Sequence, residues 1–295
     1  MIVSASYRTD IPAFYGAWFL GRLRAGVCRV ANPYGGPGYN VALTPQAADG
    51  FVFWTRNAKP FLPIFEEVAA RGFPFVVQYT ITGYPRALEP SVVPAEEAVA
   101  LVKQLARRYG RRAVVWRYDP VFLTSLTPPD WHRRRFAELA AMLRAATDET
   151  VLSFAQIYAK TRLNSDRAAR RYGFTWSDPD PAAKAALLGE LAAVARERGF
   201  RPTLCSQPEL LTDAIEPAAC IDSARLSDLA GRPIKARTKG NRPGCLCAES
   251  RDIGAYDTCP HGCVYCYAVS SRGVAKRFLS AHEAQAELLA RPKIS

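Results

Sequence analysis

The strongest constraint on the fold is a repeat of short apolar runs and longer amphipathic stretches along most of the chain. The apolar runs are rich in β-branched and aromatic residues, as is typical of strands buried on both faces of a parallel sheet. The stretches between them carry apolar residues at helical spacing. The pattern predicts strands at 1–7, 28–32, 51–55, 73–81, 113–122, 151–158 and 201–206, and helices at 11–26, 59–72, 94–110, 129–147 and 180–199.

Six or seven such strand–helix units within residues 1–230 favour an α/β fold of the TIM-barrel type, complete or partial, with mostly parallel strands. An open doubly wound sheet is the alternative. The sequence offers no glycine fingerprint and no phosphate-binding loop to mark the switch point of such a sheet. We therefore expect residues 1–230 to form one barrel-like domain.

Polar side chains recur where the predicted strands end. In a barrel, the carboxyl ends of the strands form the face that carries the active site. Their recurrence after several strands predicts a polar cavity at that face. The candidate catalytic residues at these positions are Arg8, Asp10, Arg117, Asp119, Gln156 and Lys160.

Seven of the eight cysteines lie between residues 205 and 266, and three of them form a C-x3-C-x2-C loop. Such spacing lets three thiolates converge on one metal centre, and seven thiolates exceed the four that one tetrahedral zinc or one four-iron cluster uses. We expect residues 231–295 to form a cysteine-rich iron–sulfur segment packed on the barrel mouth. The metal ligands are predicted to form two centres, one with Cys259, Cys263 and Cys266 and the other with Cys205, Cys220, Cys245 and Cys247.

Charge and hydropathy limit the setting in which the chain works. The N-terminus lacks a basic leader with an apolar core, and no apolar run is long enough to cross a membrane, so we expect a cytoplasmic protein with reduced thiols and no membrane partner. The net charge of +12 permits attraction to phosphate. The basic segment 235–242 precedes the cysteine loop and is a candidate contact with nucleic acid.

The loop CPHGCVYC at 259–266 resembles the cluster loop of the radical SAM superfamily. The resemblance implies a 4Fe-4S cluster held by Cys259, Cys263 and Cys266, with one iron open to S-adenosylmethionine and with Tyr265 beside the adenine. It also implies an electron donor such as a ferredoxin or flavodoxin. The longer stretch 245–268, together with SASYRTDIPAFY near the N-terminus, looks like an uncharacterised bacterial family with a C-terminal cysteine cluster of this kind.

The chain departs from the superfamily in two respects. In ordinary radical SAM enzymes the cysteine loop follows the first barrel strand, whereas here it follows the last predicted one. The acidic double-glycine motif that contacts the methionine amino group is also missing, because the glycines of 34–38 have no carboxylate beside them.

Three functions fit the sequence. The first is a radical-SAM-like enzyme with one or two 4Fe-4S clusters and a substrate of unknown class, with nucleic acid as a candidate. The second is a nucleic-acid-binding or repair protein whose clusters are structural or redox-active, with 235–242 contacting phosphates. The third is a structural zinc protein in which the pair Cys245 and Cys247 and the pair Cys263 and Cys266 bind one ion.

Overall fold

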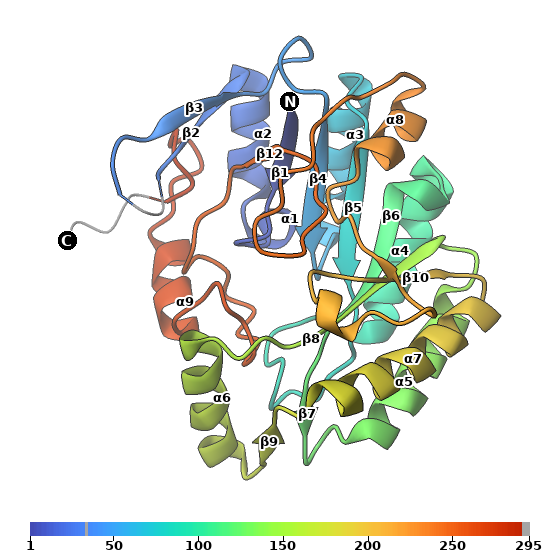
Figure 1. The fold of residues 1–295 in the computed structure, drawn as a ribbon. Helices are drawn as coiled ribbons and strands as arrows, with labels where there is room; N and C mark the ends of the chain where they lie inside the picture. The colour runs from blue at the N-terminus through green and yellow to red at the C-terminus, as the bar shows by residue number, and fades with distance from the viewer. Residues whose placement is uncertain (33–34, 291–295) are drawn as a thin grey trace.

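A computed structural model describes residues 1–32 and 35–290, and its centre is an eight-stranded sheet (Figure 1). Every ladder in this sheet is parallel. The order across the sheet is β11-β10-β8-β6-β5-β4-β1-β12. The strands are β1 (Ile2–Ala5), β4 (Gly50–Thr55), β5 (Phe75–Thr80), β6 (Val114–Val121), β8 (Glu149–Phe154), β10 (Arg201–Leu204), β11 (Glu216–Pro217) and β12 (Ser250–Asp252).

The strands follow one another across the sheet in chain order, and the last strand, β12, lies beside the first. This is the succession of a barrel, and it lacks the reversal of a doubly wound sheet. No ladder joins β11 to β12 in the part of the chain that the structure describes. Near that seam, the N–H of Ala248 donates to the carbonyl oxygen of Ile221 at 2.9 Å. The predicted α/β fold with a large parallel sheet is therefore confirmed, and the described residues show no closed barrel.

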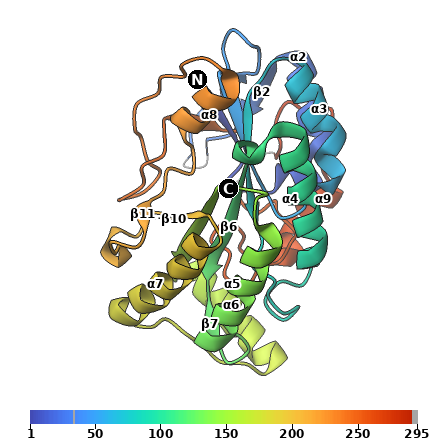
Figure 2. The same ribbon diagram turned by 90° about the vertical axis from the view of Figure 1, so that its right-hand side faces the viewer.

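Helices cover the outside of the sheet, and α5 and α7 pack against each other there (Figure 2). Sequence signals explain several of their ends: Asp180 caps the start of α7 by accepting from the N–H of Ala183 at 2.9 Å, and Gly26 ends α2 with a φ of 72°. The helices are α1 (Ile11–Phe14), α2 (Gly16–Ala25), α3 (Leu62–Ala70), α4 (Ala95–Tyr109), α5 (Pro129–Leu143), α6 (Ala159–Tyr172), α7 (Pro181–Glu197), α8 (Ser223–Ala230) and α9 (Arg272–Ser280), with 3₁₀ turns at Lys59–Phe61, Arg111–Ala113 and Pro208–Leu210.

The main apolar core lies between one face of the sheet and α2, α3, α4, α5 and α7, whereas Leu226 of α8 packs with Ile2 and Val52 on the other face. Phe19 of α2 contacts Phe51 and Phe53 of β4 edge-on, and Trp116 of β6 stacks on Phe136 of α5. Packed aromatic pairs of this kind bury large areas and hold the strands in register. Apolar packing thus occupies the middle of the strands, and polar side chains can lie at their carboxyl ends.

Several segments differ from the sequence prediction, among them the helices α6, α8 and α9, which were not predicted. The stretch 28–32 was predicted as a strand of the main sheet, but β2 (Val27–Val30) pairs antiparallel with β3 (Tyr39–Ala42) in a separate hairpin. A second small pair joins β7 (Leu123–Thr124) to β9 (Trp176–Ser177). The strand β12 comes from within the predicted segment 231–295 and extends the sheet beside β1. Of the helices described, none has both the length and the apolar character needed to cross a membrane.

Candidate functional site

The loop that follows β12, residues 253–271 (the cysteine loop), contacts segments that follow other strands of the sheet. The N–H of Val264 donates to the carbonyl oxygen of Leu88, beyond the end of β5, at 3.1 Å. The side-chain amide of Asn164 in α6, which follows β8, donates to the carbonyl oxygen of Val269 at 3.0 Å. The cysteine loop therefore lies at the carboxyl ends of the parallel strands.

Asp10 ties the end of β1 to the cysteine loop. One of its carboxylate oxygens lies 2.8 Å from Nε2 of His261 and accepts from the N–H of Arg56 at 2.8 Å. The other oxygen accepts from the N–H of Ala13 at 2.9 Å and so caps α1. His261, which belongs to the cysteine loop, has a buried side chain. One carboxylate thus holds two strand ends and the cysteine loop together.

Tyr265, which the superfamily resemblance implies beside the adenine, is buried against Tyr84 and Phe122. Its hydroxyl accepts from Nη2 of Arg56 at 2.7 Å and donates to the carboxylate of Glu89. Arg56 also donates to the same carboxylate at 2.7 Å. Burial raises the pKa of the Tyr265 phenol well above its ordinary value. The aromatic ring of the motif therefore anchors the loop to the sheet in this structure.

Cys259, Cys263 and Cys266 (the three-cysteine group) line one cavity of about 160 Å³. Burial raises the pKa of all three thiols, to about 12 for Cys263, while the nearby guanidinium of Arg56 acts in the opposite direction on Cys263 and Cys266. The other lining residues come from the segment after β5, from α6, from the cysteine loop itself and from the start of α9: Ala87, Pro90, Asn164, Arg167, Ala168, Arg171, Tyr172, His261, Gly262, Val264, Val269 and Arg272.

Cys205, Cys220, Cys245 and Cys247 (the four-cysteine group) meet after β10 and before β12. The Cys220 thiol lies 3.5 Å from the Cys205 sulfur, and the Cys247 sulfur accepts from the N–H of Ile221 at 3.3 Å. A hydrogen bond from Cys247 lowers the pKa of Cys245 to about 5. Cys220 interacts with Cys247 as well as with Cys205. The four thiols therefore form a connected set, which the proposed zinc pairing of Cys245 and Cys247 with Cys263 and Cys266 would have to break.

Two arginines donate directly to sulfur atoms of the four-cysteine group. Nη1 of Arg117 lies 3.0 Å from the sulfur of Cys220, and Nη2 of Arg242 lies 3.4 Å from that of Cys205. Arg242 also donates to the side-chain oxygen of Gln156 at 2.9 Å. Positive charge at hydrogen-bonding distance favours thiolate over thiol. Arg117 acts to lower the pKa of Cys205 and of Cys220, but the neighbouring thiols and burial outweigh it and raise both pKa values above the ordinary value.

Arg117 is itself fixed on several sides. It donates to Gln78 at 3.1 Å, pairs with Asp119, and lies over the ring of Trp54 with its Cζ 4.9 Å from the centroid. Asp119 also accepts from Ser153. Although burial opposes ionisation, the Arg117 guanidinium holds the pKa of Asp119 below its ordinary value. Arg117, Asp119 and Gln156, all predicted from strand ends, therefore surround the four-cysteine group.

Arg8 and Lys160, also predicted from strand ends, both lie near the ring of Tyr256. Cζ of Arg8 is 5.3 Å and Nζ of Lys160 is 5.5 Å from its centroid. Nε of Arg8 is 3.8 Å from Asp252, whose carboxylate accepts from Ser4 at 2.8 Å. Sequence reasoning missed Asp252, as it missed Arg56 and Glu89, because no local spacing marks these residues.

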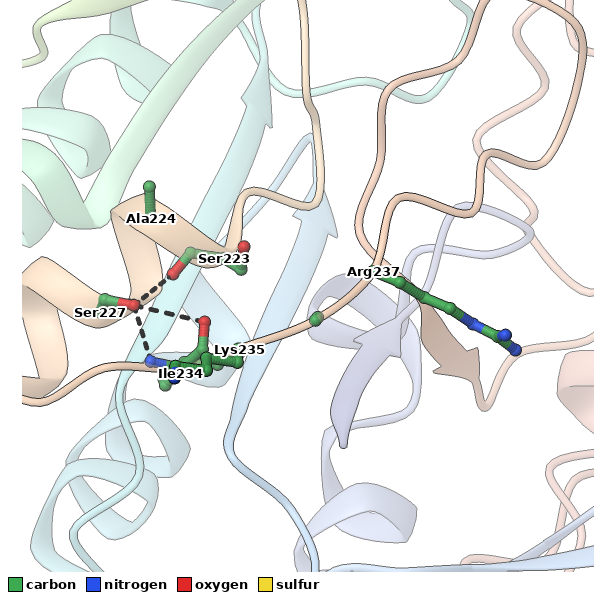
Figure 3. Close-up of a pocket in the computed structure, with 7 residues that line it drawn as sticks. Ser223, Ala224, Ser227, Ile234, Lys235 and Arg237 are labelled. Carbon is green, nitrogen blue, oxygen red and sulfur yellow. Dashed lines mark hydrogen bonds between the residues drawn. The ribbon is translucent and has the colours of Figure 1, made fainter.

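Part of the charge of the basic segment 235–242 is neutralised by a carboxylate at the surface. Arg237 and Lys239 pair with Glu249 at 2.7 and 3.0 Å, and Arg242 turns toward the four-cysteine group. An open cavity of about 520 Å³ beside α8 is lined by Ser223, Ala224, Ser227, Ile234, Lys235, Ala236 and Arg237. Figure 3 shows Ser227 bonded to Ser223 and Ile234 there, with Arg237 extending away from the helix.

Both cysteine groups offer thiols as donors, which a zinc ion and an iron–sulfur cluster can both use. Across residues 1–32 and 35–290, no three His, Cys, Asp or Glu side chains are arranged to hold one metal ion. A four-iron cluster spaces its thiolate ligands around a larger centre than a single ion does, and hydrogen bonds to its sulfurs help to set its reduction potential. Both cysteine groups consist of thiols with arginine nearby, so their residues fit that kind of centre.

Comparison with known proteins gives a family match over nearly the whole chain. Residues 2–268 match the model described as "Domain of unknown function (DUF1848)". No curated protein sequence matches this chain.

Three solved structures resemble parts of the fold. A D-hydantoinase is 8% identical with a TM-score of 0.31, over 70% of this chain and 40% of that one. A D-hydantoinase from Bacillus sp. AR9 is 10% identical with a TM-score of 0.33, over 78% and 44%. A triazine hydrolase variant is 13% identical with a TM-score of 0.31, over 69% and 45%. The chain spans less than half the length of these structures, and similarity this weak carries no argument about activity.

Proposed function

The chain belongs to the DUF1848 family, whose description assigns no function, and we propose from the site itself that it is an iron–sulfur enzyme of the radical SAM type. One observation carries the proposal: Cys259, Cys263 and Cys266 line a single cavity in a loop at the carboxyl ends of a parallel sheet. Three thiolates leave one iron of a four-iron cluster without a protein ligand.

The position of the loop after the last strand does not separate it from the first strand. Because β12 pairs with β1, the cysteine loop emerges beside the end of β1, where Asp10 binds His261. Bound at the three thiols, a 4Fe-4S cluster would supply an open iron for S-adenosylmethionine and an electron for its reductive cleavage, as the superfamily resemblance implies.

The residues around the three-cysteine group have separate tasks in this proposal. Arg56 offsets the negative charge of a thiolate-bound cluster, because its guanidinium acts on both Cys263 and Cys266. Asp10 orients the loop through His261. Arg8 and Lys160 supply cations at strand ends for an anionic group of the cofactor or the substrate.

The four-cysteine group is proposed as a second 4Fe-4S centre with a complete set of protein ligands. Arg117 and Arg242 donate to two of its sulfurs, and hydrogen bonds to sulfur are among the features that set the potential of such clusters. With no iron left open, this centre serves electron transfer or structure. The buried Asp119, paired with Arg117, belongs to its surroundings.

Metal analysis of anaerobically purified protein tests the proposal. We expect about eight irons and eight sulfides per chain, about half of them lost in Cys259→Ala and the other half in Cys247→Ala. Cys28→Ala is the matched control, because this buried cysteine lies in β2, away from both groups. Zinc without sulfide in the wild-type protein would refute the cluster assignment. If instead every ligand substitution removed the same iron, there would be one centre.

The open iron has its own test. The electron paramagnetic resonance spectrum of the reduced protein is recorded with and without S-adenosylmethionine, in the wild type and in Cys247→Ala. We expect the cofactor to change the signal in both proteins, and deoxyadenosine to form under strong reductant. An unchanged signal with no deoxyadenosine would remove the radical mechanism and leave a redox or structural cluster.

A further inference from the structure

Two basic helices flank the opening of the cavity that the three cysteines line. Arg167 and Arg171 of α6 and Arg272 of α9 belong to its lining. Figure 1 shows α6 and α9 at the same corner of the molecule. We call the exposed side of these helices around the cavity the α6–α9 face; its cations are Lys160, Arg162, Arg167, Arg170 and Arg171 on α6, and Arg272, Lys276 and Arg277 on α9.

Carboxylates do not neutralise this face. The only acidic residue of the two helices is Asp166, and it accepts a hydrogen bond from the Trp176 indole at 2.9 Å. Within the described residues, no ion pair joins any cation of the α6–α9 face to a carboxylate. By contrast, Arg133 of α5 pairs with Asp130 and Glu190. The unbalanced charge produces an attractive field for an acidic surface.

Exposed apolar side chains lie among these arginines. Leu163 is 52% exposed and Tyr172 is 44% exposed. Leu163, Arg167 and Arg171 are spaced four residues apart, so they share one side of α6. Apolar anchors within a rim of arginine are typical of protein interfaces, whereas a surface that contacts only phosphates gains little from an exposed leucine. The face therefore fits a protein partner better than a nucleic acid.

The three cysteines approach the surface at this point. Each of them is partly exposed, and they share the cavity with Arg167, Arg171 and Arg272. Electron transfer between proteins weakens steeply with distance, so a redox partner must dock close to the centre it reduces. A partner bound on the α6–α9 face would lie against the wall of the three-cysteine cavity.

We propose that the α6–α9 face docks an acidic one-electron carrier protein of the ferredoxin or flavodoxin class. This inference rests on the proposed function, because it gives the three-cysteine centre its electron donor. One electron passes from the reduced carrier to the cluster, so the carrier is oxidised by one electron and the cluster is reduced by one. No bond forms or breaks between the two proteins.

Charge reversal on α6 tests the docking surface. The variant Arg167→Glu/Arg171→Glu is compared with Arg107→Glu/Arg108→Glu, which reverses two exposed arginines at the end of α4, outside the cavity lining. Binding of a purified bacterial flavodoxin is measured by calorimetry. We expect the α6 variant to bind at least about tenfold more weakly than the wild type, with the α4 variant near the wild type. Wild-type binding should also weaken as salt rises to about 0.5 M, a result that requires no variant.

Further measurements separate this inference from the proposed function. Rapid mixing with reduced flavodoxin should show slower cluster reduction in Arg170→Glu, which changes an exposed arginine of α6 outside the cavity lining, whereas dithionite should reduce this variant and the wild type equally. Equal flavodoxin binding by both variants, or wild-type binding that is indifferent to salt, would overturn the docking surface even in an iron-loaded protein. Binding of a single-stranded RNA that the α6 variant loses, with flavodoxin binding unchanged, would assign the face to nucleic acid instead. Absence of iron from the protein would refute the proposed function and not the binding result.

Discussion

Replacement of Tyr265 by phenylalanine separates two roles for the aromatic residue of the cysteine motif. In the structure its hydroxyl joins the cysteine loop to Arg56 and Glu89. The resemblance to radical SAM enzymes instead implies a ring that contacts adenine. Phenylalanine keeps the ring and removes only the hydroxyl, so the first role is lost and the second is retained.

The expected cost follows from the partners that remain. Glu89 still receives a hydrogen bond from Arg56 at 2.7 Å and one from Thr82 at 2.7 Å, so its buried carboxylate is not left alone. The hydroxyl nevertheless bonds to two charged groups, and each such bond contributes about 1.5–3 kcal/mol. Because the two partners bind each other in its absence, we expect a loss of about 1.5–3 kcal/mol in the free energy of unfolding for the pair of bonds together.

Urea unfolding monitored by fluorescence measures this loss, and the iron content of the folded protein is determined alongside. Tyr158→Phe is the control, because that tyrosine is 46% exposed and water can replace the contacts of its hydroxyl with Gln156 and Arg242. It should change the stability by less than about 0.5 kcal/mol. An unchanged stability in Tyr265→Phe would show that the hydroxyl does not anchor the loop, and the argument from its burial would fail.

Three further predictions concern the scaffold. Burial lowers the pKa of His132 to about 4 from 6.5, so the unfolded chain binds a proton at this histidine before the folded protein does as the pH falls. Urea unfolding at about pH 7.5 and pH 5 should therefore show a loss of about 2 kcal/mol in the wild type but not in His132→Gln. Arg225 is 1% exposed and bonds to two carboxylates, so Arg225→Met should lower the free energy of unfolding by about 3 kcal/mol, as measured by thermal unfolding. An unchanged stability would contradict the role given to the buried ion pairs. Gly254→Ala places a Cβ in steric conflict with the Ser6 hydroxyl and should lower the stability by about 1–3 kcal/mol, whereas Gly189→Ala in the open middle of α7 should be neutral or stabilising in the same assay.

The apolar periodicity was sufficient to predict most of the parallel sheet, because strands that are buried on both faces consist largely of apolar residues. It failed for α6, whose residues are mostly charged or polar and which lacks a continuous apolar stripe. It also failed for β12, a strand of three residues whose sequence is SRD. Its pairing with β1 depends on backbone hydrogen bonds and on Asp252, and neither leaves a pattern in the local sequence.

The candidate site divides in the same way. The cysteine spacing and the polar strand ends were visible in the sequence because they depend on neighbouring residues. Arg56 and Glu89 were not, because they lie 33 residues apart and acquire meaning only beside Tyr265, more than 170 residues further on. The donation from Arg117 to the Cys220 sulfur likewise joins residues 103 positions apart. Contacts of this kind are formed by the fold and leave no local pattern in the sequence.

The pairing of the first strand with the last has a consequence for how the chain is made. During synthesis β1 can pair with β4 early, but its other edge faces β12, and Ser4 must wait for Asp252, 248 residues later. At ribosomal rates of about 5–20 residues per second, that edge stays open for roughly 10–50 seconds. An apolar strand with a free edge recruits other chains, and pairings so distant in sequence form slowly. We therefore expect the edge of β1 in the nascent protein to stay open to pairing with other chains until the cysteine-bearing end emerges.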